Sequence, residues 1–103
     1  MHSASTMYGR IGKISAVSEQ RDALAAILLE ATRDMPGCLS YVVATDASDA
    51  EVLWVTEVWN NRASHTASLN LPTVRASIGK GRPLIAGFSS AVETTPLGGV
   101  GVR

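Results

Sequence analysis

Apolar and polar positions follow two different periods in the first third of the chain. Residues 7–17 alternate loosely between the two kinds, which predicts a β-strand. Apolar side chains then recur at spacings of three and four residues, the period of an amphipathic helix. These positions are Leu24, Ile27, Leu28, Ala31 and Met35. We expect Ser18 to cap the start of this helix, and Pro36 with Gly37 to end it.

The middle of the chain has the composition of an antiparallel hairpin. Residues 38–45 and 52–59 are rich in β-branched and aromatic side chains. The polar residues 46–51 between them predict a connecting turn. Asn60 or Asn61 then suits the N-cap of a short helix that runs through Leu69.

A further helix and a last strand complete the pattern. Pro72 favours the first turn of a helix that ends near residues 79–81, and residues 88–94 predict the last strand. The resulting order, β-α-β-β-α-β, is the ferredoxin-like arrangement. In this α+β fold, helices cover one face of an antiparallel sheet.

The central strands are mostly apolar on both faces. Side chains alternate along a strand, so Val52, Trp54, Thr56 and Val58 point one way, and Leu53, Val55, Glu57 and Trp59 point the other. The helices of one small chain can cover only one face, and soluble monomers rarely expose a large apolar patch. We therefore expect a homodimer that stacks sheet on sheet. The alternative is an ordinary antiparallel sheet whose solvent-exposed face is mildly apolar.

Composition and charge indicate the class of protein and which partners to expect. Of the 103 residues, 46% are hydrophobic and 17% are charged, which is typical of a globular protein. We assign the domain to residues 7–95, with a disordered leader at residues 1–6 and a flexible tail at residues 96–103. Nine basic and nine acidic residues balance, so nucleic acid is not an expected partner.

Other classes are disfavoured by missing sequence features. No apolar run approaches the ~20 residues that cross a bilayer, so no membrane partner is expected. The chain lacks a secretory signal, and its single cysteine, Cys38, cannot form an internal disulfide, so the cytoplasm is the simplest location. We expect Cys38 to be a buried, inert thiol. Zinc-ligand spacing, a phosphate loop and a dinucleotide fingerprint are all missing, so we expect neither a metal nor a cofactor.

An acidic residue interrupts the apolar strand at residues 52–59. A carboxylate that faces a protein interior needs a partner or a raised pKa. In a functional interpretation, Glu57 takes or orients a proton, and Trp59 forms an aromatic wall against a flat substrate. In a structural interpretation, Glu57 pairs with an arginine or lies near a sheet edge, and Trp59 anchors the following helix.

A histidine follows on the predicted short helix. Histidine side chains can act as general bases near neutral pH, and a strand-to-helix connection can bring His65 close to Glu57 and Trp59. Otherwise His65 is an exposed or hydrogen-bonded structural residue. Glu57 and His65 are the candidate catalytic residues.

Three further polar residues are candidates for substrate binding, together with Trp59. Arg82 lies in a predicted loop near one end of the sheet and could hold a phenolate or a carboxylate, or could be a solvated arginine. Tyr41 and Asn60 are weaker candidates of the same kind.

Three segments together resemble the antibiotic biosynthesis monooxygenase superfamily. They are MPGCLSYVV after the amphipathic helix, WVTEVW in the next strand, and ASLNLPTVRA after it. The resemblance covers roughly residues 8–94. It implies a dimeric α+β barrel with a pocket between the sheet and the helices of each subunit. Characterised members oxidise anthrones or hydroquinones with O2 and without metal or flavin, whereas others cleave haem, isomerise small sugar-like compounds, or have no known activity.

One position departs from the family pattern. Family members often have a histidine nine residues after the strand-ending tryptophan, and haem-binding members use a helix histidine as the iron ligand. Here that position is Ser68, and the histidine lies one helical turn earlier, at His65. The departure argues against haem cleavage and weakens a direct transfer of the family histidine's role to His65.

Three functional hypotheses remain open at this point. The first is a cofactor-independent monooxygenase that acts on a hydroquinone, anthrone or similar phenol, with a small aromatic substrate and O2 as its partners. The second is an isomerase or lyase that enolises a small carbonyl compound and consumes no oxygen. The third is a non-catalytic dimeric module that binds a small ligand.

Overall fold

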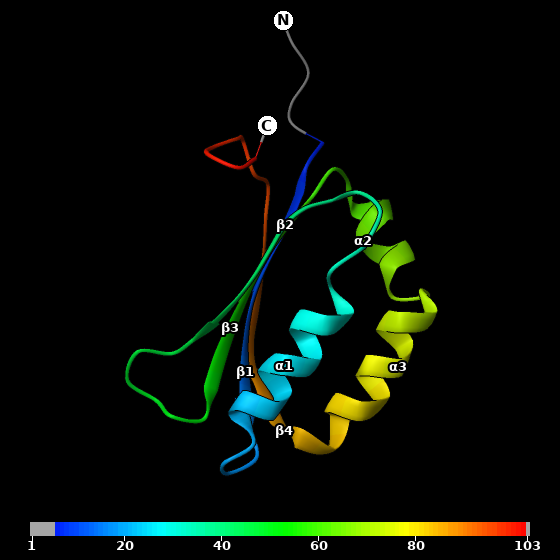
Figure 1. Ribbon diagram of the computed structural model, residues 1–103. Coiled ribbons are helices and arrows are strands. Elements are labelled where there is room, and N and C mark those ends of the chain that lie inside the picture. Colours follow the sequence, from blue (N-terminus) through cyan, green and yellow to red (C-terminus); the bar gives the residue numbers. More distant parts are fainter. Residues whose placement is uncertain (1–5, 103) are drawn as a thin grey trace, which may run out of the picture.

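The computed structural model describes residues 6–102, which form a four-stranded antiparallel sheet with three α-helices on one face (Figure 1). In chain order the elements are β1 (Tyr8–Ala16), α1 (Arg21–Ala31), β2 (Cys38–Thr45), β3 (Val52–Trp59), α2 (Arg62–Ser68), α3 (Pro72–Gly81), the 3-10 turn η1 (Arg82–Leu84) and β4 (Ile85–Thr94). The strands lie in the order β2-β3-β1-β4. The predicted ferredoxin-like α+β fold is confirmed, and residues 1–5 of the expected leader lie outside the described residues.

The hairpin and the central strand set the register of the sheet. β2 and β3 begin and end where their composition predicted, and they pair antiparallel, with Tyr41 opposite Glu57. β1 lies between β3 and β4, so Arg10 is opposite Glu57 on one side and opposite Glu93 on the other. This register brings residues from three separate parts of the chain to the same level of the sheet.

The start of α1 differs from the prediction. The helix begins at Arg21, and Gln20 is its N-cap without a side-chain capping bond. Ser18 does not cap it, because the chain first makes a turn in which the Gln20 N–H donates to the Val17 carbonyl oxygen (2.9 Å). Within this turn Glu19 adopts a left-handed backbone conformation, with φ of 66°.

The end of α1 also comes earlier than Pro36 and Gly37. The helix ends at Ala31, and the Thr32 hydroxyl donates to the Leu28 carbonyl oxygen (2.7 Å). A hydroxyl that bonds back to the preceding turn competes with the backbone ladder. The apolar face nevertheless continues past the helix, since Met35 is buried.

The second half of the chain follows its predicted elements more closely. Asn61 caps α2 by accepting a hydrogen bond from the Ser64 N–H (2.8 Å), and α3 opens at Pro72, as predicted. β4 begins at Ile85, earlier than the expected start at residue 88, because η1 leads directly into the pairing of Ile85 with Ala16.

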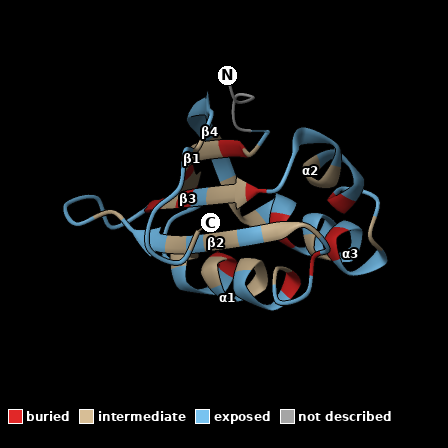
Figure 2. Ribbon diagram, turned by 90° about the horizontal axis from the view of Figure 1, so that it is seen from above, coloured by how far each residue is buried: buried red, intermediate tan, exposed pale blue. Residues whose placement is uncertain are grey.

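The core lies between the helices and the inner face of the sheet, as the buried residues in Figure 2 show. It has two clusters of buried side chains. The first contains Ile14, Ala16, Leu24, Leu53 and Val55, and the second contains Tyr8, Met35, Trp59 and Val74. The second cluster lies under α2 and α3, so it supports the end of β3 from which Glu57 and Trp59 project.

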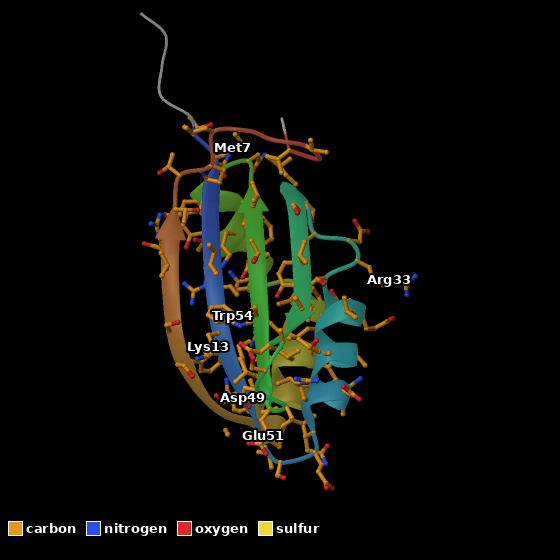
Figure 3. The ribbon with its side chains drawn as sticks, turned by 90° about the vertical axis from the view of Figure 1, so that its left-hand side faces the viewer. Met7, Lys13, Arg33, Asp49, Glu51 and Trp54 are labelled. Carbon is orange, nitrogen blue, oxygen red and sulfur yellow. The ribbon has the colours of Figure 1, made fainter. Side chains whose placement is uncertain are left out.

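The outer face of the sheet carries no helix (Figures 1 and 3). Val42 on β2 is 51% exposed, and Val92 on β4 is 54% exposed. Between them Lys13 lies over the ring of Trp54, at 5.5 Å from the ring centroid. This face is therefore partly apolar. Within residues 6–102, no helix is long and apolar enough to cross a membrane.

The chain after β4 turns across one end of the sheet (Figure 3). Gly9 of β1 makes this path possible, because a Cβ at that position would clash with the Thr94 hydroxyl and would lie 2.9 Å from Pro96 Cγ. The first residue of the predicted tail, Pro96, thus packs against β1.

Candidate active site

A cavity of about 830 Å³ lies between the inner face of the sheet and the helices. Its walls come from all four strands and all three α-helices, and most of its lining is apolar. Leu24 and Leu28 of α1 form one side, and Val55 of β3 forms the floor. Arg10, Tyr41, Glu57 and His65 supply polar groups to this lining, so a bound molecule would have a largely apolar environment with a few polar contacts.

Glu57, Trp59 and His65 meet at one end of the cavity, and all three contribute to its lining. The Trp59 Nε1–H donates to Glu57 Oε1 at 3.0 Å, and His65 Nε2 lies 3.8 Å from the same oxygen. The side chains of Glu57 and His65 are only 13% and 17% exposed. The carboxylate is thus fixed by the indole and forms an ion pair with the imidazole once the imidazole is protonated.

Aromatic contacts surround the imidazole of His65. Its ring centroid lies 5.1 Å from that of Tyr8, and it makes an edge-on contact with Trp59 at 5.5 Å. The Ser68 hydroxyl donates to the His65 carbonyl oxygen (2.6 Å), and Ser68 is buried. Ser68, at the position where the family often has its histidine, therefore braces the backbone that carries His65.

Trp59 is only 1% exposed, so it belongs to the core and offers little face to a substrate. The structural interpretation of this residue fits its position better than an aromatic wall does. Its role at the site is carried by its N–H, which sets the orientation of Glu57. Trp59 also contributes to the cavity lining, so the stacking of a substrate ring on it stays a prediction.

Tyr41 lies beside Glu57 on the neighbouring strand, and it also lines the cavity. Burial raises the pKa of Tyr41, and the charge of Glu57 raises it further. The phenol therefore keeps its proton at neutral pH and can donate a hydrogen bond. Burial likewise raises the pKa of the half-buried thiol of Cys38, which agrees with the unreactive cysteine expected from the sequence.

Arg10 is a cavity residue that the sequence analysis did not select. It lies on β1 between Glu57 and Glu93, and it contributes to the lining. Strand alternation placed it on the same side as Tyr8, Gly12 and Ile14, which was the available signal. The sequence does not show that β1 pairs with β3. Only this pairing places Arg10 opposite Glu57.

The other two candidates lie away from this end of the cavity. Asn60 is exposed and does not contribute to the lining, so the structure does not bring it to the site. Arg82 lines the cavity but at its other end, since it precedes Ile85, which pairs with Ala16. The steps along β1 from Arg10 to Ala16 span about 20 Å. The backbone of Arg82 is therefore remote from that of Glu57.

The described residues contain no group of three or more His, Cys, Asp or Glu side chains that could hold a metal ion. The single pair of such residues at the site, Glu57 and His65, shares one contact at 3.8 Å.

The comparisons with known proteins agree with this fold. The family model described as Antibiotic biosynthesis monooxygenase matches residues 7–80. The chain belongs to the antibiotic biosynthesis monooxygenase family. Membership in this family supports a general monooxygenase-like role. The resemblance noted in the sequence is thereby confirmed.

Solved protein structures from several organisms are similar to this chain. A crystal structure from Chloroflexus aurantiacus, described as a candidate antibiotic biosynthesis monooxygenase, is 56% identical and has a TM-score of 0.92, covering 94% of this chain and 99% of its own. A candidate monooxygenase of the same description from Nitrosomonas europaea is 16% identical, with a TM-score of 0.80 over 94% and 96% of the two chains. The second likeness concerns the fold alone. No protein with a curated function matches the chain at a significant level.

Proposed function

We propose that this protein is a cofactor-independent monooxygenase that oxidises a hydroquinone, an anthrone or a related phenolic compound with O2. The observation on which the proposal rests is the Glu57–His65 pair at one end of a largely apolar cavity. Once deprotonated, such a substrate is electron-rich enough to reduce O2 directly. The protein then has to take a proton, stabilise an anion and exclude water.

His65 takes the proton in this proposal. Its neutral imidazole accepts the proton of the substrate, and the resulting imidazolium pairs with Glu57, whose Oε1 lies 3.8 Å from Nε2. Trp59 holds the carboxylate in place through its N–H. A base positioned in this way typically accelerates a reaction by about 10²–10⁴-fold.

Arg10 and Tyr41 stabilise the substrate anion. Both line the cavity at the level of Glu57, one on each neighbouring strand. The guanidinium of Arg10 supplies a positive charge, and the phenol of Tyr41, which keeps its proton, supplies a neutral donor. Arg82, in η1, also lines the cavity and would bind an acidic substituent of the substrate. Asn60 has no role in the proposal.

The electrons and atoms of the reaction balance without a further reductant. In an anthrone, the CH2 group loses two hydrogens and gains one oxygen atom of O2, and the other oxygen atom leaves as water. In a hydroquinone, a ring carbon loses its hydrogen and gains one oxygen atom of O2, the two hydroxyls become carbonyls, and the other oxygen atom leaves as water, which gives a hydroxyquinone. Both reactions begin with the proton transfer that we assign to His65.

We also propose that the protein works as a homodimer in which the outer faces of two sheets stack. The support is the partly apolar outer face, on which Val42 and Val92 are more than half exposed. Stacked sheets pack about 10 Å apart and would cover both residues.

The test is oxygen uptake by metal-free protein with a panel of anthrones and hydroquinones. We expect turnover above autoxidation, isotopic label from O2 in the quinone product of an anthrone, and a loss of about 10²-fold or more in His65→Gln. Thr66→Ala, an exposed neighbour on α2, is the matched control and should keep full activity. Uptake no faster than autoxidation would refute the proposal. Solvent deuterium entering a carbonyl substrate under anaerobic conditions would instead assign the site to an isomerase.

A further inference from the structure

Tyr8, Arg62 and Glu93 form a closed cluster next to the candidate active site, and we call it the tyrosine clamp. The Tyr8 hydroxyl donates to Glu93 Oε2 at 2.6 Å, and Arg62 NH1 lies 2.9 Å from the same oxygen. The guanidinium also lies over the Tyr8 ring, with Cζ at 4.6 Å from the ring centroid. Each member therefore contacts the other two.

The clamp joins three elements that are distant in sequence. Tyr8 opens β1, Arg62 opens α2, and Glu93 is the last residue but one of β4. The chain between Tyr8 and Glu93 spans 85 positions. Glu93 lies beyond residues 7–80, which the family model matches, so the clamp depends on a part of the chain outside that match.

α2 needs such an attachment because it is short. It has seven residues, and isolated helices of this length are not stable in water. Its N-cap bond, from the Ser64 N–H to Asn61, is internal to the segment and does not fix the helix to the sheet. The clamp supplies a connection from the first residue of α2 to β1 and β4.

His65 lies three residues after Arg62, on the same side of α2. The ring of Tyr8 contacts both residues: Arg62 Cζ lies 4.6 Å from its centroid, and the His65 centroid lies at 5.1 Å. The Tyr8 ring therefore packs against both the guanidinium and the imidazole.

We propose that the tyrosine clamp positions the imidazole of His65 against Glu57 at the cavity wall. Tyr8, Arg62 and Glu93 are positioning residues, because they act through His65 and not on the substrate. The inference rests on the proposed function for its kinetic consequence, but its structural consequence is independent of that function.

Arg62 and Glu93 are the members to substitute first. Their side chains are 65% and 49% exposed, and exposed ion pairs contribute little to stability. Arg62→Gln should therefore remain folded while it loses the ion pair and the cation–π contact. Tyr8→Phe keeps the ring and loses only the hydroxyl, and Glu93→Gln keeps an acceptor for that hydroxyl.

The first measurement is the NMR signal of the His65 ring protons, assigned by comparison with His65→Gln. In the native protein the rings of Tyr8 and Trp59 should displace these signals from their values in an unfolded chain. We expect Arg62→Gln and Tyr8→Phe to move them towards those values, and Glu93→Gln to have a smaller effect. Arg33→Gln is the matched control, since it breaks the exposed ion pair with Glu30 (3.1 Å) elsewhere on the surface.

The second measurement is steady-state kinetics on a substrate identified by the oxygen-uptake panel. A displaced base should lower kcat about 10- to 100-fold and leave KM nearly unchanged. His65 signals in Arg62→Gln and Tyr8→Phe that match those of the native protein would overturn the clamp. If the native protein consumes no oxygen, the proposed monooxygenase function fails, whereas displaced His65 signals would still support the clamp.

Discussion

The turn before β2 offers the sharpest test of how α2 is seated. Gly37 has a backbone φ of +84°, in the left-handed region that residues with a Cβ rarely adopt. A Cβ added there would lie 2.6 Å from Ser64 Cβ and 2.8 Å from Asn60 Oδ1. Gly37→Ala therefore strains the turn and presses on α2 at the same time.

The expected loss of stability follows from these two effects. The left-handed conformation costs an L-residue about 1–2 kcal/mol. Overpacking typically costs a further ~1–3 kcal/mol. It applies here because Ser64 Cβ cannot rotate out of the way, so α2 itself has to move. We expect Gly37→Ala to lower the free energy of unfolding by about 2–5 kcal/mol, a melting-temperature loss of at least about 8 °C for a domain of this size.

Chemical and thermal denaturation at one fixed protein concentration measure this effect, since the stability of a dimer depends on concentration. Gly79→Ala is the matched control, because it lies within α3, has no neighbouring atom within 4 Å of the added Cβ, and should gain about 0.5–1 kcal/mol. His65 follows Ser64 directly, so the displaced helix should also lose oxygen-uptake activity. A Gly37→Ala protein within about 0.5 kcal/mol of the native one would show the reasoning to be wrong.

Two further predictions concern other parts of the sheet. Val42→Asp places a charge on the outer face and should convert the proposed dimer to monomers in analytical ultracentrifugation. The control Leu29→Asp, on α1, should leave the dimer intact, since Leu29 is 53% exposed and Val42 is 51% exposed. Equal behaviour of the two variants would contradict the stacked dimer. The Trp54 indole N–H, with the backbone N–H groups of Asp49 and Ser48, lowers the pKa of Asp46 to about 2. Because this pKa is depressed on folding, the stabilising contribution of Asp46 is complete above pH ~4 and is lost as the pH falls towards 2. The free energy of unfolding of Asp46→Asn should therefore depend less on pH in that window. An unchanged dependence would exclude this role of Asp46.

The strands and the Glu57–Trp59 pair could be predicted from sequence because a strand has a fixed period. Alternation along β3 puts Glu57 and Trp59 on one face whatever the strand pairs with. The short connection to α2 likewise limits how far His65 can lie from them. These inferences depend only on local geometry, and the structure brings the three side chains together at the cavity.

The parts that escaped prediction depend on contacts between distant segments or on competition at helix ends. Arg10 becomes part of the site only through its register with Glu57, and the clamp needs β4 beside β1. No local pattern encodes either pairing. The end of α1 was placed too late because Pro36 is a strong stop signal, whereas the Thr32 hydroxyl bonds to the preceding turn and ends the helix first.

The strand order also determines when the cavity can form during folding. β2 and β3 are consecutive and can pair as a hairpin, but β1 and β4 come from opposite ends of the chain and must close a long loop. Long-range pairing of this kind is slower than local pairing, because the entropy of loop closure is lost before the contacts are gained. We therefore expect the cavity wall that β4 contributes to form late in folding, after the β2–β3 hairpin.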